Sequence, residues 1–399
     1  MVSVAPGSIP LQHGRVETPT EPPVSGLSPG DQLRLDELFE RFEHLNPRSI
    51  GYPCNQTWDY SSLYRFLQFS ANNIGDPFQG SIFKMNTHEF EREVVEEFAR
   101  FTQADPDDHW GYVTAGGTEG NMYGLYLARE LHPEGIVYFS EASHYSVAKI
   151  LRLQNMRNIM IRSLPSGEID YEDLRESIRI HRDVPPIIFA NIGTTMKGAV
   201  DRLDRIREIF ERFAIQSHYI HADAALSGMI LPFVNNPPPW NFADGVDSLS
   251  ISGHKLIGAP LPCGIAMARK SHVDRIARSV EYVGVNDTTI MGSRSAFSPL
   301  ILWYALKKLH EEGLANIVRR SLELADYAIG KLASIGVEAW RNPDSITVVF
   351  PRPPAPLMET WVIAPQGDIA HIITLPHVSR EVIDAFVADL ATALSATQG

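Results

Sequence analysis

The amino-acid sequence predicts an α/β protein with a mainly parallel sheet, followed by a smaller α+β region. Between residues 110 and 257, short apolar segments of the strand type alternate with amphipathic segments of the helix type. This alternation is typical of βαβ units with helices on both faces of one sheet. After residue 335, strand-like segments are separated by loops, which favours a second, α+β domain. With 399 residues, of which 44% are hydrophobic and 21% charged, the chain can bury a large core.

The elements before residue 110 belong to an N-terminal part. Residues 1–29 hold six of the 28 prolines and few large apolar residues, which predicts a flexible arm. Apolar residues at helical spacing predict a helix over 30–45. The segment 46–79 is rich in aromatic residues and asparagine and receives no assignment. A threonine followed by early acidic residues predicts a helix over 87–101.

The elements after residue 110 follow in regular order. Apolar runs predict strands at 110–114, 135–140, 186–194, 218–224, 248–252, 346–350 and 371–375. Amphipathic spacing predicts helices at 118–131, 146–155, 203–213, 300–335 and 379–395. The chain is therefore expected to form a flexible arm (1–29), an N-terminal helical segment (30–85), a large domain (86–290) and a small C-terminal domain (291–399).

Charge and cysteine content indicate which kinds of binding partner and which cell compartment to expect. The net charge is −13 and no basic run is present, which argues against nucleic acids and anionic membranes as partners. The cysteines are Cys54 and Cys263, too few for a disulfide framework and compatible with a reducing compartment. The sequence has no apolar run of 18 residues and no signal-peptide pattern. We expect a cytoplasmic protein that acts on a small molecule.

Polar residues gather where the predicted strands end, at the edge where open α/β sheets bind ligands. Gly116, Gly117 and Thr118 follow the first strand and open a helix, whose free N–H groups suit a phosphate. A plain turn with a threonine cap is the alternative. Neither the dinucleotide fingerprint nor the P-loop pattern is present.

Two more strand ends carry ionisable residues. His144 follows the second strand and could stack on an aromatic ligand, or be a helix cap or core histidine. Asp223 ends the strand HYIHADA on the same face as Tyr219 and His221. A buried aspartate there needs a cation or several donors, or else caps the next turn. A metal site formed by His218, His221 and Asp223 is disfavoured because His218 falls on the opposite face, so no metal is expected.

Lys255 ends the strand after Asp223, in the stretch SLSISGHKLIGAPLPCG. Lysine is almost never fully buried without a partner, and a buried amine becomes nucleophilic as its pKa falls. Such an amine can form a Schiff base with an aldehyde. A phosphate cradle, a stacking histidine, a carboxylate for a ring nitrogen and this lysine are together what pyridoxal 5′-phosphate needs. The sequence therefore predicts a pyridoxal-phosphate enzyme.

The motifs TAGGTEGN, EASHYS, NIGTTMKGAVD, HADAALSG and SISGHK resemble those of the pyridoxal-phosphate-dependent group II amino-acid decarboxylases. Within that family the chain is most similar to bacterial histidine decarboxylases and plant serine decarboxylases, over about residues 45–399. The resemblance implies fold type I, with a seven-stranded, mainly parallel sheet in the large domain. It also implies a homodimer with active sites at the interface and release of carbon dioxide and a primary amine. The cofactor motifs alone also fit aldol cleavage or transamination.

The resemblance assigns roles by motif. Lys255 would bind the cofactor aldehyde, Asp223 would pair with the ring nitrogen, and His144 and Ala225 would lie on the two ring faces, with His144 a candidate acid or base. The remaining cofactor-binding positions would be Gly117, Thr118, Thr194, Thr195, Ser252, His254 and Ser293. Ser293 belongs to the segment 288–294, which resembles a loop that crosses the dimer interface.

Two departures from the family pattern concern the substrate. Ile82-Phe83 stand where histidine- and serine-decarboxylase-like members carry Asn-Tyr, and Ser295-Ala296-Phe297 stand where they carry Asn-Gly-His. Both stretches border the substrate end of the family pocket. Because a pocket with fewer polar partners favours apolar ligands, leucine, valine or methionine are expected as substrates beside histidine.

Overall fold

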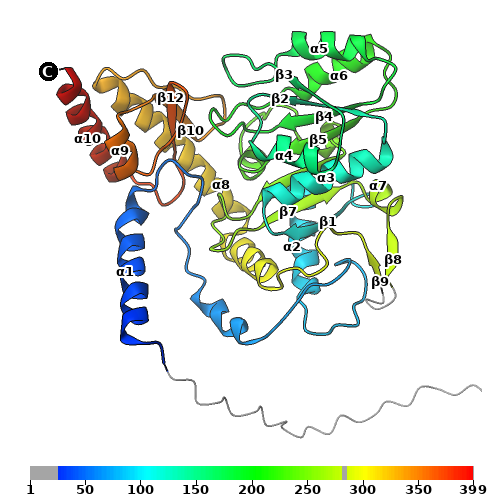
Figure 1. Cartoon of the computed structure of the whole chain (residues 1–399), viewed down its shortest axis with the longest axis horizontal. Coiled ribbons are helices and arrows are strands. Elements are labelled where there is room, and N and C mark those ends of the chain that lie inside the picture. Colours follow the sequence, from blue (N-terminus) through cyan, green and yellow to red (C-terminus); the bar gives the residue numbers. More distant parts are fainter. Residues whose placement is uncertain (1–25, 281–284, 399) are drawn as a thin grey trace, which may run out of the picture. The chain divides into compact units, whose positions relative to one another are not determined.

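The computed structural model describes residues 26–280 and 285–398 (Figure 1). The chain divides into two units, Met1–His44 and Leu45–Gly399. Helix α1 (Pro29–Leu45) agrees with the helix predicted over 30–45. Most of the predicted flexible arm, residues 1–25, lies outside the described residues.

A seven-stranded mixed sheet forms the centre of the second unit, within the described part of the chain. Its order is β1-β7-β6-β5-β4-β2-β3, and neighbouring strands are parallel except where β7 pairs with β1 and β6. The strands are β1 Trp110–Thr114, β2 Ile136–Ser140, β3 Asn158–Ile161, β4 Pro186–Asn191, β5 Tyr219–Asp223, β6 Ser248–Ser252 and β7 Gly264–Ala268. The predicted fold class is confirmed.

Helices cover both faces of this sheet (Figure 1). The core on one face includes residues of α3 and α4, and the core on the other includes residues of α2, α5, α6 and α8. The helices are α2 His88–Phe101, α3 Gly117–Leu131, α4 Ser146–Leu153, α5 Tyr171–Ile180, α6 Leu203–Arg212, α7 Lys270–Asp274 and α8 Phe297–Ser334. The backbone of α8 is broken at His310. Short 3-10 turns occupy Asn46–Arg48, Ser61–Gln68, Ser227–Met229, Leu231–Phe233 and Phe242–Asp244.

A three-stranded antiparallel sheet of order β10-β12-β11 forms the smaller, C-terminal layer. It consists of β10 Thr347–Pro351, β11 Ala364–Gln366 and β12 Ile369–Ile373, and packs with α8, α9 (Ala355–Thr360) and α10 (Arg380–Gln398) around its own core. A separate pair, β8 (Arg278–Val280) and β9 (Val285–Asp287), is antiparallel. The predicted strands at 346–350 and 371–375 correspond to β10 and β12 within two residues.

Helix α3 packs unusually close to strand β6. Three glycines on one face of α3, namely Gly117, Gly120 and Gly124, face three alternate serines of β6. A methyl group at Gly120 would overlap Ser250, and one at Gly117 would lie 2.8 Å from the Ser252 Oγ. Glycine at every contact therefore sets the distance between this helix and the sheet. The N-terminus of α3 is held at the end of β6.

Candidate active site

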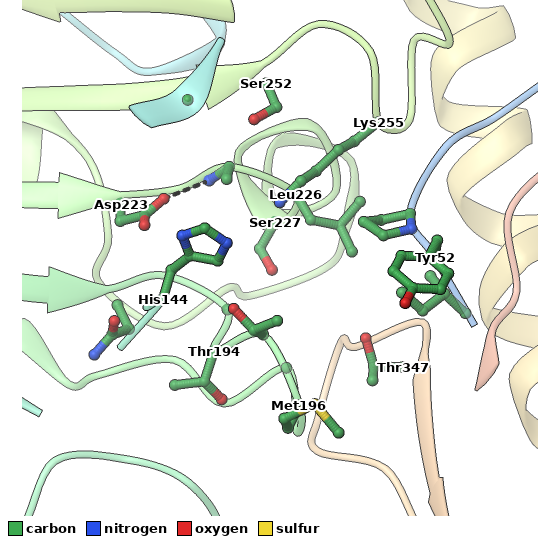
Figure 2. A pocket seen from close by; sticks show the side chains of 18 of the residues that line it. Tyr52, His144, Thr194, Met196, Asp223, Leu226, Ser227, Ser252, Lys255 and Thr347 are labelled. Carbon is green, nitrogen blue, oxygen red and sulfur yellow. Dashed lines mark hydrogen bonds between the residues drawn. The ribbon is translucent and has the colours of Figure 1, made fainter. Parts of the chain in front are cut away.

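The carboxyl ends of β1, β2, β4, β5 and β6 surround a cavity of about 210 Å³ (Figure 2). Ten of the predicted cofactor positions line it. These are Gly117, Thr118, His144, Thr194, Thr195, Asp223, Ala225, Ser252, His254 and Lys255. The structure thus brings together residues that are up to 138 positions apart in the sequence, from Gly117 to Lys255.

Lys255 extends from the loop after β6 into this cavity, toward the side where Asp223 and His144 lie (Figure 2). Its backbone is fixed because the carbonyl of Lys255 accepts the Asn55 N–H at 3.1 Å. Within the described residues, no hydrogen bond or ion pair engages the Lys255 Nζ. Burial lowers the pKa of the Lys255 ammonium, and the charges of Asp223 and Cys54 oppose part of that shift. The amine is therefore directed at a ligand and is easier to deprotonate than an ordinary lysine.

Asp223 ends β5 and is buried beside two donors. Its Oδ2 accepts from Asn121 Nδ2 at 2.9 Å, and its Oδ1 accepts from the Ala225 backbone N–H at 3.2 Å. These bonds fix the plane of the carboxylate at the cavity wall. They leave lone pairs that can accept from a protonated ring nitrogen.

His144 follows β2 and lines the same cavity as Ala225. Its Nδ1 lies 2.8 Å from Ser146 Oγ, which fixes the ring. Burial lowers the pKa of His144, with Asp223 opposing the shift and Lys255 adding to it. The imidazole is therefore uncharged at neutral pH, a state suited to stacking on a cationic ring.

The turn from β1 to α3 presents unused backbone donors. Gly116 has φ +150°, a conformation that L side chains rarely adopt. Among residues 26–280 and 285–398, no acceptor lies within hydrogen-bonding distance of the backbone N–H groups of Gly117 and Thr118. With the hydroxyls of Thr118 and Ser252 at the same cavity, they give a helix N-terminus the donors that suit an anion. The residues present fit the phosphate, ring nitrogen and aldehyde of pyridoxal phosphate.

Two predicted positions lie in the loop after β4. Thr194 Oγ1 accepts the Ala199 N–H at 3.0 Å, so this buried hydroxyl shapes the loop that lines the cavity. Asp201, which was not singled out from the sequence, accepts from Asn191 N at 2.7 Å and from Ile169 N at 2.7 Å. The motif NIGTTMKGAVD is thus a closed loop anchored by its last residue.

Five predicted residues lie away from this cavity. They are Ile82, Phe83, Ser293, Ser295 and Phe297, none of which is among its lining residues. Ile82 is 65% exposed and Phe83 37% exposed. Ser293 is exposed and accepts from Asn72 Nδ2 at 3.0 Å. Within one chain, therefore, these side chains do not line this cavity.

Other residues that the sequence analysis did not single out also line the cavity. Tyr52 comes from the unassigned N-terminal segment, Met196 from the loop after β4, and Thr347 and His371 from the small sheet (Figure 2 labels the first three). His371 Nδ1 lies 3.2 Å from the Met196 carbonyl and its Nε2 lies 3.1 Å from the Gly51 carbonyl. Nothing local in the sequence marks these positions, because they meet only through the packing of separate segments.

Comparisons with known proteins agree with this geometry. The family described as "Pyridoxal-dependent decarboxylase conserved domain" matches residues 93–338. Histidine decarboxylase from Pseudomonas entomophila (strain L48) is 47% identical over 367 residues, which is 91% of each chain. Histidine decarboxylase from Mesorhizobium japonicum is 44% identical and covers 92% of this chain and 99% of its own.

Solved structures show the same fold. L-methionine decarboxylase from Streptomyces sp. 590 superposes with a TM-score of 0.84 at 28% identity, covering 92% of this chain and 95% of its own. Glutamate decarboxylase from Lactobacillus brevis, 18% identical, shares the fold with a TM-score of 0.74. Among the described helices, none is long and apolar enough to cross a membrane. The predicted cofactor and reaction class are confirmed, and the chain belongs to the pyridoxal-phosphate-dependent group II amino-acid decarboxylases.

Proposed function

We propose that this decarboxylase acts on an amino acid with an uncharged, apolar side chain, and that Lys255, Asp223 and His144 carry its chemistry. The observation that supports these roles most is the Lys255 amine, which extends half-buried into a cavity shared with Asp223 and with the free N–H groups of α3. An unpartnered ammonium in such a place is costly unless a ligand uses it.

The roles follow from the positions of these side chains. When bound, pyridoxal phosphate supplies an aldehyde that reacts with amines and a ring that accepts the electron pair left by carbon dioxide. Asp223 would hold a proton on the ring nitrogen, and the N–H groups of Gly117 and Thr118 would hold the phosphate. His144 would lie against the ring. Lys255 would be placed to move a proton at the substrate Cα.

The substrate side chain is inferred from what lines the cavity. Tyr52, Met196, Leu226 and Ile373 supply apolar surface to its wall. The ionisable residues among the lining groups are Tyr52, His144, Asp223, His254, Lys255 and His371, so the described part of the chain offers no arginine here for an acidic side chain. The only carboxylate among them is already assigned to the ring nitrogen. An uncharged side chain such as that of leucine, valine or methionine fits this lining.

Histidine is the second candidate, because the two sequence relatives named above are histidine decarboxylases at 44–47% identity. A screen of the twenty amino acids for carbon dioxide release, with pyridoxal phosphate supplied, separates the two. Fastest release from leucine, valine or methionine supports the proposal, and fastest release from histidine refutes it. Formation of a keto acid without carbon dioxide would refute the decarboxylase assignment itself.

The role of Lys255 is tested by trapping. Borohydride should attach the cofactor to the wild-type chain at Lys255, and peptide mass spectrometry should find it there. Lys255→Ala should lose turnover and the covalent label. Lys270→Ala, an exposed lysine paired with Asp274, is the matched control and should keep both. A label on another lysine in the wild type would overturn the assignment.

We further propose a homodimer in which the predicted substrate residues act across the interface. The segment 67–85 and the segment around Met291 both carry exposed apolar side chains. Asn72 connects them, because its backbone N–H donates to the Met85 carbonyl and its Oδ1 accepts from the Arg294 backbone N–H. We call this the apolar surface; its exposed members are Leu67, Phe69, Ile82, Phe83, Met85 and Met291. Exposed apolar groups gathered in this way are typical of protein interfaces. Ile82 and Phe83 would then reach the partner's cavity, which explains their distance from their own.

A hybrid dimer tests this arrangement. Phe83→Asp and Lys255→Ala chains should each be inactive alone. Co-expressed, they should regain about half of the wild-type activity per hybrid dimer, because one site then combines an intact Lys255 with an intact Phe83. If Phe83 served its own chain, the hybrid would contain no intact site and would stay inactive.

We also propose the cytoplasm as the compartment, supported by the free thiols Cys54 and Cys263. Cell fractionation with an antibody against the chain tests this. Recovery with the periplasmic or secreted fraction would contradict it.

A further inference from the structure

A row of three buried polar side chains leads from strand β6 to Asp223. Ser248 Oγ lies 2.8 Å from His221 Nδ1, and His221 Nε2 lies 3.0 Å from Asn121 Oδ1. Asn121 Nδ2 completes the row, 2.9 Å from Asp223 Oδ2. All three side chains are buried: Asn121 is 3% exposed, and His221 and Ser248 are 0% exposed.

The direction of each hydrogen bond is fixed by its neighbours. A carboxylate only accepts, so Asn121 must turn its NH₂ toward Asp223 and its carbonyl oxygen toward His221. His221 must then carry its proton on Nε2. Burial lowers the pKa of His221 to about 3, so the ring is neutral and its Nδ1 accepts from the Ser248 hydroxyl. Every bond in the row therefore donates toward Asp223.

The surrounding backbone is shaped to hold this row. Gly124, one turn after Asn121 on α3, lies against His221, and a methyl group there would overlap the ring and lie 2.7 Å from Ser248 Oγ. The ring is held at both nitrogens, by Ser248 at Nδ1 and by Asn121 at Nε2. The arrangement is thus one fixed polar row within an otherwise close-packed helix–sheet contact.

We infer that Asn121, His221 and Ser248 are positioning residues that hold Asp223 in the charged form and orientation needed at the cofactor ring nitrogen. This inference rests on the proposed role of Asp223. Donors aimed at a carboxylate stabilise its anion, and an anion is what keeps a pyridine nitrogen protonated. A polarised row strengthens the last bond beyond what an isolated asparagine would supply. His221 thereby acts on the cofactor through Asn121 and Asp223 without lining the cavity itself.

The test uses the full-length holoenzyme loaded with pyridoxal phosphate carrying ¹⁵N at the ring nitrogen. Its ¹⁵N chemical shift reports directly whether that nitrogen is protonated, and equilibrium dialysis gives the cofactor dissociation constant. The variants are Asn121→Leu, which removes the last donor, and Ser248→Ala, which removes the first. Thr102→Val is the control, because it removes a buried hydroxyl bond of α2 (to the Phe98 carbonyl, 2.7 Å) unconnected to the row.

In the wild type the ring nitrogen should be protonated at neutral pH. Asn121→Leu should weaken cofactor binding by about tenfold to a hundredfold, since a bond to a charged group is lost, and should move the ¹⁵N shift toward the unprotonated value. Ser248→Ala should move the ¹⁵N shift in the same direction and should weaken cofactor binding by about threefold to tenfold. Ser248→Ala is a small change, so it preserves the test if Asn121→Leu does not fold.

The outcomes separate the two proposals. A wild-type ring nitrogen that is unprotonated would refute the role of Asp223 itself. A protonated wild type with Ser248→Ala indistinguishable from Thr102→Val in ¹⁵N shift would refute the row while leaving Asp223 in place. A purely structural role would lower stability in all three variants without moving the shift.

Discussion

Replacing Gly124 by alanine should destabilise this protein, although the same change stabilises most helices. Alanine is favoured over glycine inside a helix by about 1 kcal/mol. Here the new methyl group would overlap the His221 ring and crowd Ser248. Overpacking of this kind costs about 1–3 kcal/mol, and displacing His221 loses two buried hydrogen bonds of about 1 kcal/mol each. The net loss in unfolding free energy should be about 2–4 kcal/mol.

Urea unfolding followed by circular dichroism, at one fixed cofactor concentration, measures this loss. Gly330→Ala is the matched control: Gly330 also lies within a helix, α8, and a methyl group there would have no atom within 4 Å. That variant should gain about 0.5–1 kcal/mol. If Gly124→Ala were as stable as Gly330→Ala, the close contact between α3 and β6 would be wrong.

Three further predictions concern charged and titratable groups. Asp223→Ala should lower kcat by several orders of magnitude, because the ring nitrogen loses its partner; steady-state kinetics with near-normal turnover would contradict this. Arg294→Met should cost about 3–5 kcal/mol in urea unfolding, since it strands the buried carboxylate of Glu91, and Glu91→Gln in the same chain should recover part of the loss. Burial lowers the pKa of His221 from 6.5 to about 3, so between these pH values the ring binds a proton only when the chain unfolds. The free energy of unfolding should therefore fall by about 1.4 kcal/mol per pH unit as the pH drops from 6.5 toward 3. Unfolding free energies at pH 6.5 and 5.5 should therefore differ less in His221→Gln than in the wild type, and equal differences would show that the imidazole is not buried uncharged.

The sequence predicts the fold class and most strands because their apolar runs are long enough to be seen. Strand β7, GIAMA, was missed: its small residues are buried on both faces between β1 and β6, so no alternation marks it. Strand β3 was missed because it is short and at the sheet edge, with exposed positions. Helix α5 begins at an Asp170 cap that accepts from two N–H groups, a signal that the sequence does contain.

The site was predictable as far as it depends on strand ends. Lys255, Asp223 and His144 each follow a strand, and parallel strands bring such ends together. The partners of Asp223 were less visible, because Asn121 sits in the first turns of a helix and His221 in a strand interior. The glycine spacing 117, 120 and 124 was the available signal for their close approach. The rest of the cavity lining was not predictable, since it joins segments that are 320 residues apart, such as Gly51 and His371.

Because of the glycine–serine contact between α3 and β6, the two parts of the site tolerate amino-acid substitution to different degrees. Where Gly117, Gly120 and Gly124 meet the serines of β6, a larger residue would push the N-terminal turns of α3 away from the sheet. Another part of the cavity wall is formed by residues such as Tyr52, Met196 and Thr347, which lie outside the contact between α3 and β6. Substitutions at Tyr52, Met196 or Thr347 can therefore change which substrate fits, while the packing of α3 against β6 is unchanged.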